Sequence, residues 1–155
     1  MLITSKGRYA LYMMIDIAQQ GADTRTSLRA VSERQGISLK YAEQLAKPLV
    51  AAGLLTSTRG AHGGYSLARP AAEVSVADIL HAAEGNYAPV SCQEIESGDC
   101  PRKAGCQTFD FWEGLDNVVN GYLESVKLDA FLSGRTNWED MARQLLAEND
   151  RALAH

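Results

Sequence analysis

The chain has 155 residues, of which 46% are hydrophobic and 22% charged, a composition that suits one packed domain with an extension. No apolar run approaches the roughly 18 residues of a membrane span and the first residues lack the order of a signal peptide, so we expect a cytoplasmic protein with no membrane partner. The net charge of −4 divides into +5 over residues 1–70 and −9 over residues 71–155, and this basic half keeps a nucleic-acid partner open.

The first two predicted helices are bounded by cap residues and glycines. Ser5 is the expected N-cap of the first, whose apolar residues recur at helical spacing up to Gly21. Thr26 or Ser27 is the expected cap of the second, which should end at Gly36. Short helices with sharp boundaries are therefore expected in this part of the chain.

A third helix is predicted to begin after Ser38. Pro48 lies inside its pattern and should kink the helix or restart it near its last turn, because proline removes a backbone donor and crowds the preceding turn. The apolar stripe of this helix consists of Leu39, Ala42, Leu45, Leu49 and Val50.

The period then changes from helix to strand. Two short strands, about Leu55–Thr58 and Tyr65–Ala68, flank the glycine-rich tip "RGAHGG". Three helices followed by a hairpin is the order of a winged helix-turn-helix, and a further helix is expected over Val76 to Glu84. Residues 1–84 are thus predicted to form a winged-helix DNA-binding domain with one following helix.

The second half is predicted to be helical apart from one loop. Residues 85–108 form a cysteine-containing loop, and a long amphipathic helix follows at about Phe109–Val126 within a segment 109–133. The extension 134–155 could hold a last helix capped by Asn137. The expected fold class is therefore mostly α, with a winged helix-turn-helix and a long C-terminal helix.

The start of the third helix and the hairpin tip carry side chains suited to DNA. A recognition helix reaches base edges near its N-terminus, where glutamine suits adenine and glutamate can accept from the cytosine amino group. An arginine at a glycine-rich tip suits a narrow minor groove. A solvated basic face on a helical bundle is the alternative, and the residue at 62 could be an exposed loop residue only. The candidate DNA-binding residues are Lys6, Ser38, Lys40, Tyr41, Glu43, Gln44, Lys47, Arg59, Gly60 and His62.

All three cysteines lie in "CQEIESGDCPRKAGC", with the spacing C-x7-C-x5-C. Clustered cysteines in a cytosolic protein indicate metal or redox chemistry more often than structural disulfides. The tight C-x2-C hooks of zinc sites are absent. Spacing alone leaves three options for Cys92, Cys100 and Cys106: an iron–sulfur cluster, another metal, or redox-active thiols.

Four features together resemble one regulator family: "ITSKGRYA", "ISLKYAEQL", "RGAHGGYSLARP" and the three-cysteine loop before a long helix. Over about residues 1–132 the chain resembles the IscR/NsrR/RirA group of winged-helix regulators. The resemblance implies a homodimer that pairs through the long helix and binds a palindromic double-stranded DNA operator. It also implies an iron–sulfur cluster (2Fe–2S or 4Fe–4S) that is held by the three cysteines and whose state changes DNA affinity. Base contacts would come from residues 38–44, and minor-groove contacts from Arg59 and Gly60.

The fourth cluster ligand departs from the family pattern. Phe109 stands where IscR-like members often have a histidine, three residues after the last cysteine, and it cannot bind iron. Arg8 stands where NsrR-like members can supply an acid from the partner's first helix. The remaining candidates are a residue of the partner, a small exogenous ligand, or Asp110, Asp99 and Glu94.

The function predicted from the sequence is a dimeric DNA-binding regulator whose cluster senses iron, redox or nitric oxide status. The first alternative is a repressor of the same fold that lacks a cluster and responds to thiol oxidation or a small molecule. The second is a protein-binding winged helix. An enzyme is not expected, because the sequence has no phosphate loop, nucleophile elbow or HExxH helix.

Overall fold

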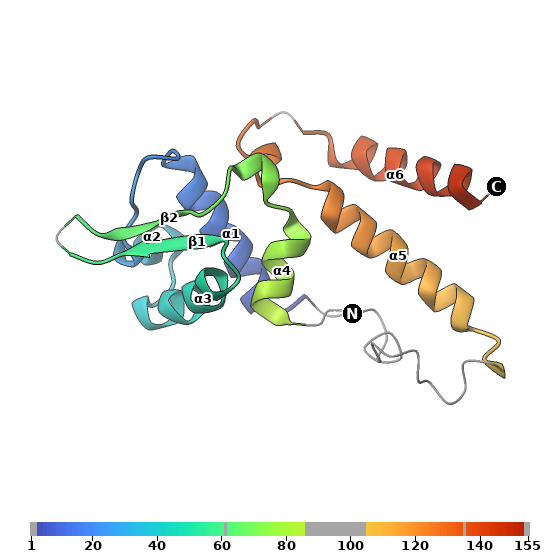
Figure 1. The fold of residues 1–155 in the computed structure, drawn as a ribbon, viewed down its shortest axis with the longest axis horizontal. Helices are drawn as coiled ribbons and strands as arrows, with labels where there is room; N and C mark the ends of the chain where they lie inside the picture. Colours follow the sequence, from blue (N-terminus) through green and yellow to red (C-terminus); the bar gives the residue numbers. More distant parts are fainter. Residues whose placement is uncertain (1–2, 61, 86–104, 135, 154–155) are drawn as a thin grey trace.

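The computed structural model describes residues 3–60, 62–85, 105–134 and 136–153 (Figure 1). Within them the fold is mostly helical with one small two-stranded sheet, which confirms the expected fold class. Most of the predicted cysteine loop, including Cys92 and Cys100, lies outside the described residues. The elements are α1 (Ser5–Gln19), α2 (Leu28–Gln35), α3 (Leu39–Ala51), β1 (Leu55–Thr58), β2 (Gly64–Leu67), α4 (Val76–Glu84), α5 (Phe109–Ser125) and α6 (Trp138–Leu153), with 3-10 turns η1 (Ala71–Glu73) and η3 (Leu128–Phe131).

Side-chain caps fix most helix starts as predicted. Ser27 caps α2 and Ser38 caps α3, and each hydroxyl accepts from a backbone N–H three residues further on. The prediction for α1 was wrong by one residue, because Thr4 is the N-cap and its hydroxyl accepts from the Lys6 N–H at 3.0 Å. Ser5 is instead the first helical residue.

Two predicted boundaries change slightly, and Pro48 does not restart its helix. β2 covers Gly64–Leu67 rather than Tyr65–Ala68, and α5 ends at Ser125 with Val126 as its C-cap. α3 runs without a restart through Pro48 to Ala51. Proline lacks an N–H and crowds the turn before it, but its own carbonyl can still accept, and the Ala52 N–H donates to the Pro48 carbonyl at 2.9 Å.

The core of the winged helix is built around α1. Met13, Met14 and Ile17 of this helix are fully or almost fully buried, and they pack with Leu45 and Leu49 of α3 in one cluster. α1 contacts α2, α3, α4 and β2. This central helix therefore determines how the DNA-binding elements are placed relative to α4.

A second group of packed hydrophobic side chains joins α4 to α5. Val76 and Leu80 of α4 pack with Leu123 and Val126 at the end of α5. The backbone strengthens this contact, because the Val76 N–H donates to the Val126 carbonyl at 2.9 Å. α5 and α6 pack against each other and extend together on the side of α4 away from the β-hairpin (Figure 1). Within the described ranges, no helix is both long and apolar enough to span a membrane.

Candidate nucleic-acid interface

The turn between α2 and α3 is held by backbone geometry. Gly36 has a φ of 64°, in the left-handed region that glycine adopts at low cost, and it ends α2. The Ile37 N–H then donates to the Ser32 carbonyl at 3.0 Å. Ser38 follows at once as the cap of α3. Residues 36–38 connect the two helices, and these hydrogen bonds fix the angle between them, as a helix-turn-helix requires.

One face of α3 is polar and exposed, and the other is buried. The buried residues are Ala42, Leu45, Ala46 and Leu49. The exposed predicted residues are Ser38, Lys40, Glu43, Gln44 and Lys47. Positions three or four apart share a helix face, so the side chains from Lys40 to Lys47 form a continuous polar stripe. The structure therefore brings these five predicted residues together on the accessible side of the helix.

Tyr41 differs from its neighbours on α3. It is half-buried, packs against the main core and meets Tyr9 edge to face with ring centroids 5.9 Å apart. Tyr9 in turn meets Tyr12 edge to face at 5.7 Å. The ring of Tyr41 thus supports the packing of α3 on α1, a role that the sequence pattern did not indicate.

The wing is an antiparallel hairpin that is joined to the helix-turn-helix. β1 pairs with β2 in the register Leu55↔Leu67 to Thr58↔Gly64. Thr26, just before α2, exchanges two backbone hydrogen bonds of 2.8 Å with Tyr65 of β2. A side chain at position 64 would crowd this bridge, since a Cβ there would lie 2.9 Å from the Thr26 carbonyl oxygen. Gly64 therefore allows the hairpin to lie directly against the segment that enters α2.

The wing tip carries three of the predicted DNA-binding residues. Arg59, Gly60 and His62 are exposed beyond the last paired residues of the hairpin. Gly60 has a φ of 108°, which favours glycine, and its carbonyl accepts from the Gly63 N–H at 2.9 Å. A Cβ at Gly63 would clash with the Thr58 carbonyl oxygen. The glycines thus shape a tight, accessible tip next to one arginine.

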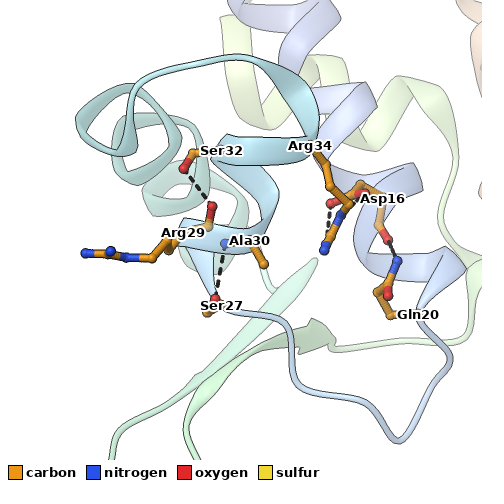
Figure 2. Close-up of polar contacts among 7 residues, drawn as sticks. All are labelled: Asp16, Gln20, Ser27, Arg29, Ala30, Ser32 and Arg34. Carbon is orange, nitrogen blue, oxygen red and sulfur yellow. Dashed lines mark hydrogen bonds and ion pairs between the residues drawn. The ribbon is translucent and has the colours of Figure 1, made fainter.

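An ion pair with a buried carboxylate braces α1 against α2 (Figure 2). Arg34 donates from Nε to Asp16 Oδ1 at 2.8 Å and from Nη2 to Asp16 Oδ2 at 2.9 Å. The Asp16 side chain is only 6% exposed, whereas that of Arg34 is 39% exposed. The hydrogen bond to Asp16 raises the pKa of Arg34, against the lowering effect of desolvation. Sequence reasoning missed this pair, which holds the helix that leads into the recognition helix.

Lys6 is exposed in the first turn of α1, as the prediction of a phosphate contact requires. The start of that turn is hydrogen-bonded to Glu84, the last residue of α4, through Thr4 and Gly7. Burial raises the pKa of Glu84, but these hydrogen bonds and the charge of Lys6 outweigh it and hold the pKa below its ordinary value. Glu84 was also missed from the sequence, because its partners lie about 80 positions earlier in the chain.

Cys106 is the one predicted cluster ligand among the described residues. It is half-buried just before α5, and its Sγ lies 3.5 Å from the Thr108 hydroxyl. A position near a helix N-terminus favours the thiolate form that binds metal. Phe109 begins the helix, and Asp110 is exposed in its first turn. In the parts of the chain that are described, no three His, Cys, Asp or Glu side chains gather to hold a metal ion.

The long helix α5 exposes large apolar side chains. Phe111 is 66% exposed and Leu115, one turn later, is 37% exposed. α4 packs against the far end of α5, where Leu123 is buried and Val119 and Tyr122 are partly buried. Exposed apolar residues at this spacing form a stripe that another helix could cover.

The chain is similar to known proteins over both the winged helix and the long helix. Residues 3–134 match the family model Rrf2, described as an iron-dependent transcriptional regulator. Protein rrf2 of Nitratidesulfovibrio vulgaris is 46% identical over 112 residues, which cover 72% of this chain and 74% of that protein. The HTH-type transcriptional regulator IscR of Vibrio vulnificus is 37% identical over 155 residues, which cover 100% of this chain and 89% of that protein. The solved structure of CymR, the global cysteine regulator of B. subtilis, is 34% identical with a TM-score of 0.68, over 88% of this chain and 99% of that chain.

Proposed function

Because this chain belongs to the Rrf2 family of transcriptional regulators, we propose that it is a cytoplasmic homodimer whose affinity for a palindromic operator is set by an iron–sulfur cluster. Its relatives and its fold are those of regulators and not of enzymes. The observation that carries the DNA-binding part is the exposed polar stripe of α3, joined to the wing through the Thr26–Tyr65 bridge.

The contacts to DNA divide between α3, the wing and α1. The start of α3 enters the major groove, where Ser38, Lys40, Glu43 and Gln44 reach base edges. Lys47 and Lys6 contact phosphates, because a lysine ammonium suits a phosphate as a point charge. Tyr41 contributes mainly by packing, since its ring is half-buried against Tyr9. The wing tip, with Arg59, Gly60 and His62, lies in the adjacent minor groove.

The dimer pairs through α5. Its exposed Phe111 and Leu115 give the apolar stripe that a second copy of the helix would cover. A twofold dimer presents two α3 helices to half-sites about one helical turn of DNA apart, which accounts for a palindromic operator.

An iron–sulfur cluster would be held by Cys92, Cys100 and Cys106. Thiolates are the protein ligands of iron–sulfur clusters, and the place of Cys106 near the N-terminus of α5 suits a thiolate. The fourth ligand is Asp110, another acid of the loop, a residue of the partner, or a small exogenous ligand, because Phe109 occupies the position three residues after Cys106. When bound, the cluster would supply an iron centre open to nitric oxide, oxygen or chelators.

The proposed switch acts through the dimer. Cys106 precedes α5, and α5 is joined to α4 by the hydrophobic contact of Val76 and Leu80 with Leu123. A change in how the cysteines are held would therefore act on the helix that sets the separation of the two recognition helices.

The first test asks whether the cluster exists. We would isolate the protein without oxygen, record its visible absorption and measure its iron and acid-labile sulfide. A coloured protein with stoichiometric iron and sulfide supports the proposal, and Cys92→Ala, Cys100→Ala or Cys106→Ala should remove the colour while the winged helix stays folded. Colourless protein without iron would leave only a DNA-binding regulator.

A second candidate function is a cluster-free repressor that responds to thiol oxidation or a small molecule. Two observations favour it: the likeness to CymR, a global cysteine regulator, and the partial exposure of Cys106 near a helix N-terminus. Colourless protein whose operator affinity changes reversibly with a thiol oxidant would support this candidate over the first.

A further inference from the structure

Glu84 ends α4, and one of its carboxylate oxygens lies at the N-terminus of α1. Glu84 Oε1 accepts a hydrogen bond from the Thr4 N–H at 3.0 Å, from the Thr4 hydroxyl at 2.6 Å and from the Gly7 N–H at 2.8 Å. The first N–H groups of a helix have no partner within the helix, and a carboxylate there is also favoured by the helix dipole. A single oxygen atom thus joins two helices that are distant in sequence.

The close approach depends on a glycine. A Cβ at Gly7 would lie 2.6 Å from Glu84 Oε1, closer than packed atoms allow, and 3.0 Å from Leu80 Cδ2, which is tighter than most packing contacts. Gly7 is buried, so no open space is available for a side chain to turn away. The contact between α1 and α4 therefore places the Glu84 carboxylate directly against the backbone of α1.

The same first turn of α1 carries exposed positive charge. Lys6 follows Thr4 by two residues, and its backbone N–H donates to the Thr4 hydroxyl, which itself donates to Glu84. Arg8 is also exposed on this turn. The position of the Thr4 hydroxyl thus fixes the backbone of Lys6, and Glu84 fixes that hydroxyl.

We propose that Glu84 is a positioning residue for DNA binding: its carboxylate holds the first turn of α1 so that the Lys6 ammonium meets a DNA phosphate. The inference rests on the proposed DNA-binding function and deepens it. Glu84 is also the last helical residue before the segment that contains Cys92 and Cys100, so the contact lies where that segment joins the winged helix.

Whether a change at Glu84 raises or lowers DNA affinity distinguishes a positioning role from simple charge repulsion. DNA is a polyanion, so an acid that acted only through its charge would repel it, and removing that charge would raise affinity. A positioning residue has the opposite sign, because losing the contact weakens DNA binding. The charge and the reach of Glu84 can be changed separately.

Two variants make this separation. Glu84→Asp keeps the charge but withdraws the oxygen by one carbon–carbon bond, whereas Glu84→Gln removes the charge but keeps an acceptor oxygen at the same reach. We expect Glu84→Asp to weaken operator binding about fivefold and to lower the salt slope by about 1 for each subunit's lost phosphate contact. Glu84→Gln should bind within about twofold of the unchanged protein, because the amide oxygen accepts the same hydrogen bonds. Glu73→Gln, at an exposed position in η1, is the matched charge control.

A double-mutant cycle with Lys6→Ala completes the test on the full-length protein. If Glu84 acts through Lys6, Glu84→Asp should have little further effect on operator affinity in the Lys6→Ala background. An equal loss in both backgrounds, or weaker binding by Glu84→Gln than by Glu84→Asp, would overturn the inference. Thermal unfolding of every variant checks folding. If the unchanged protein binds no DNA, the proposed function has failed; if it binds and the cycle is additive, only the inference on Glu84 has failed.

Discussion

Thr26 and Tyr65 exchange two backbone hydrogen bonds of 2.8 Å, although one residue lies just before α2 and the other in the wing. These hydrogen bonds attach the wing directly to the helix-turn-helix. A rigid link of this kind fixes the separation between the α3 face and the wing tip, which must reach neighbouring grooves of the same DNA duplex.

Gln44 and Lys47 should have different effects on DNA binding. Gln44→Ala removes a side chain suited to adenine, so we expect a loss of about 1–3 kcal/mol on the operator and almost none on unrelated DNA. Lys47→Ala should weaken binding to both DNAs about equally and lower the salt slope by about 1 for each subunit. Fluorescence anisotropy at several salt concentrations measures both effects. An equal loss on both DNAs for Gln44→Ala would argue against base reading by this residue.

The Asp16–Arg34 pair should stabilise the winged helix. Arg34→Ala leaves the buried Asp16 carboxylate without its two hydrogen bonds, and water that enters in place of the half-exposed arginine reduces the penalty. We expect the free energy of unfolding to fall by about 1–3 kcal/mol in urea denaturation. Arg29→Ala is the control, since Arg29 lies on the same helix as Arg34 and its side chain points away from Asp16 (Figure 2). Similar losses for the two variants would contradict a specific role for the pair.

Stability should depend on the ionisation of Glu84 at acid pH. Its pKa lies below the ordinary value, so the folded state favours the charged form. The resulting stability is fully present above the unfolded pKa of about 4.3 and is lost as the pH falls through the folded pKa. Thermal unfolding between pH 7 and pH 3 should show a constant difference between the unchanged protein and Glu84→Gln above about pH 5.5, and a smaller difference at lower pH. A difference that grows as the pH falls would mean that the pKa is raised instead.

The apolar stripe of α5 should be required for pairing of two chains. Phe111→Glu places a charge where, among the described residues, the most exposed large apolar side chain lies, so we expect it to shift sedimentation from dimer toward monomer. Asn117→Glu adds the same charge at an exposed position of the same helix and should leave the dimer intact. Dimer retained in Phe111→Glu would place the interface elsewhere.

Local signals predicted the elements well, because caps and glycines act over a few residues. Ser38 and Gly36 were identified from the sequence, and the structure places both as expected. The first helix was the exception. Thr4 rather than Ser5 caps it, and Thr4 also donates its hydroxyl to Glu84, a partner in α4 that no local pattern reveals.

The candidate site was predictable where it depends on helical spacing and less so where it depends on packing. Lys40, Glu43 and Gln44 are exposed on one face of α3, as periodicity indicated. Tyr41 lies in the same run, but its half-buried position depends on Tyr9 of another helix. Long-range contacts of this kind follow from the tertiary fold, so a single sequence gives no direct signal for them.

The central claim is that the cluster state sets operator affinity, and an anaerobic DNA titration tests it most directly. Protein isolated without oxygen, and the same preparation after the cluster has been removed by a chelator, would be titrated against a palindromic operator at fixed salt. We predict that the two forms differ in dissociation constant by about tenfold or more, and that Cys106→Ala behaves like the cluster-free form before and after chelation. Equal dissociation constants for the two forms, in protein that contains iron and sulfide, would contradict the claim.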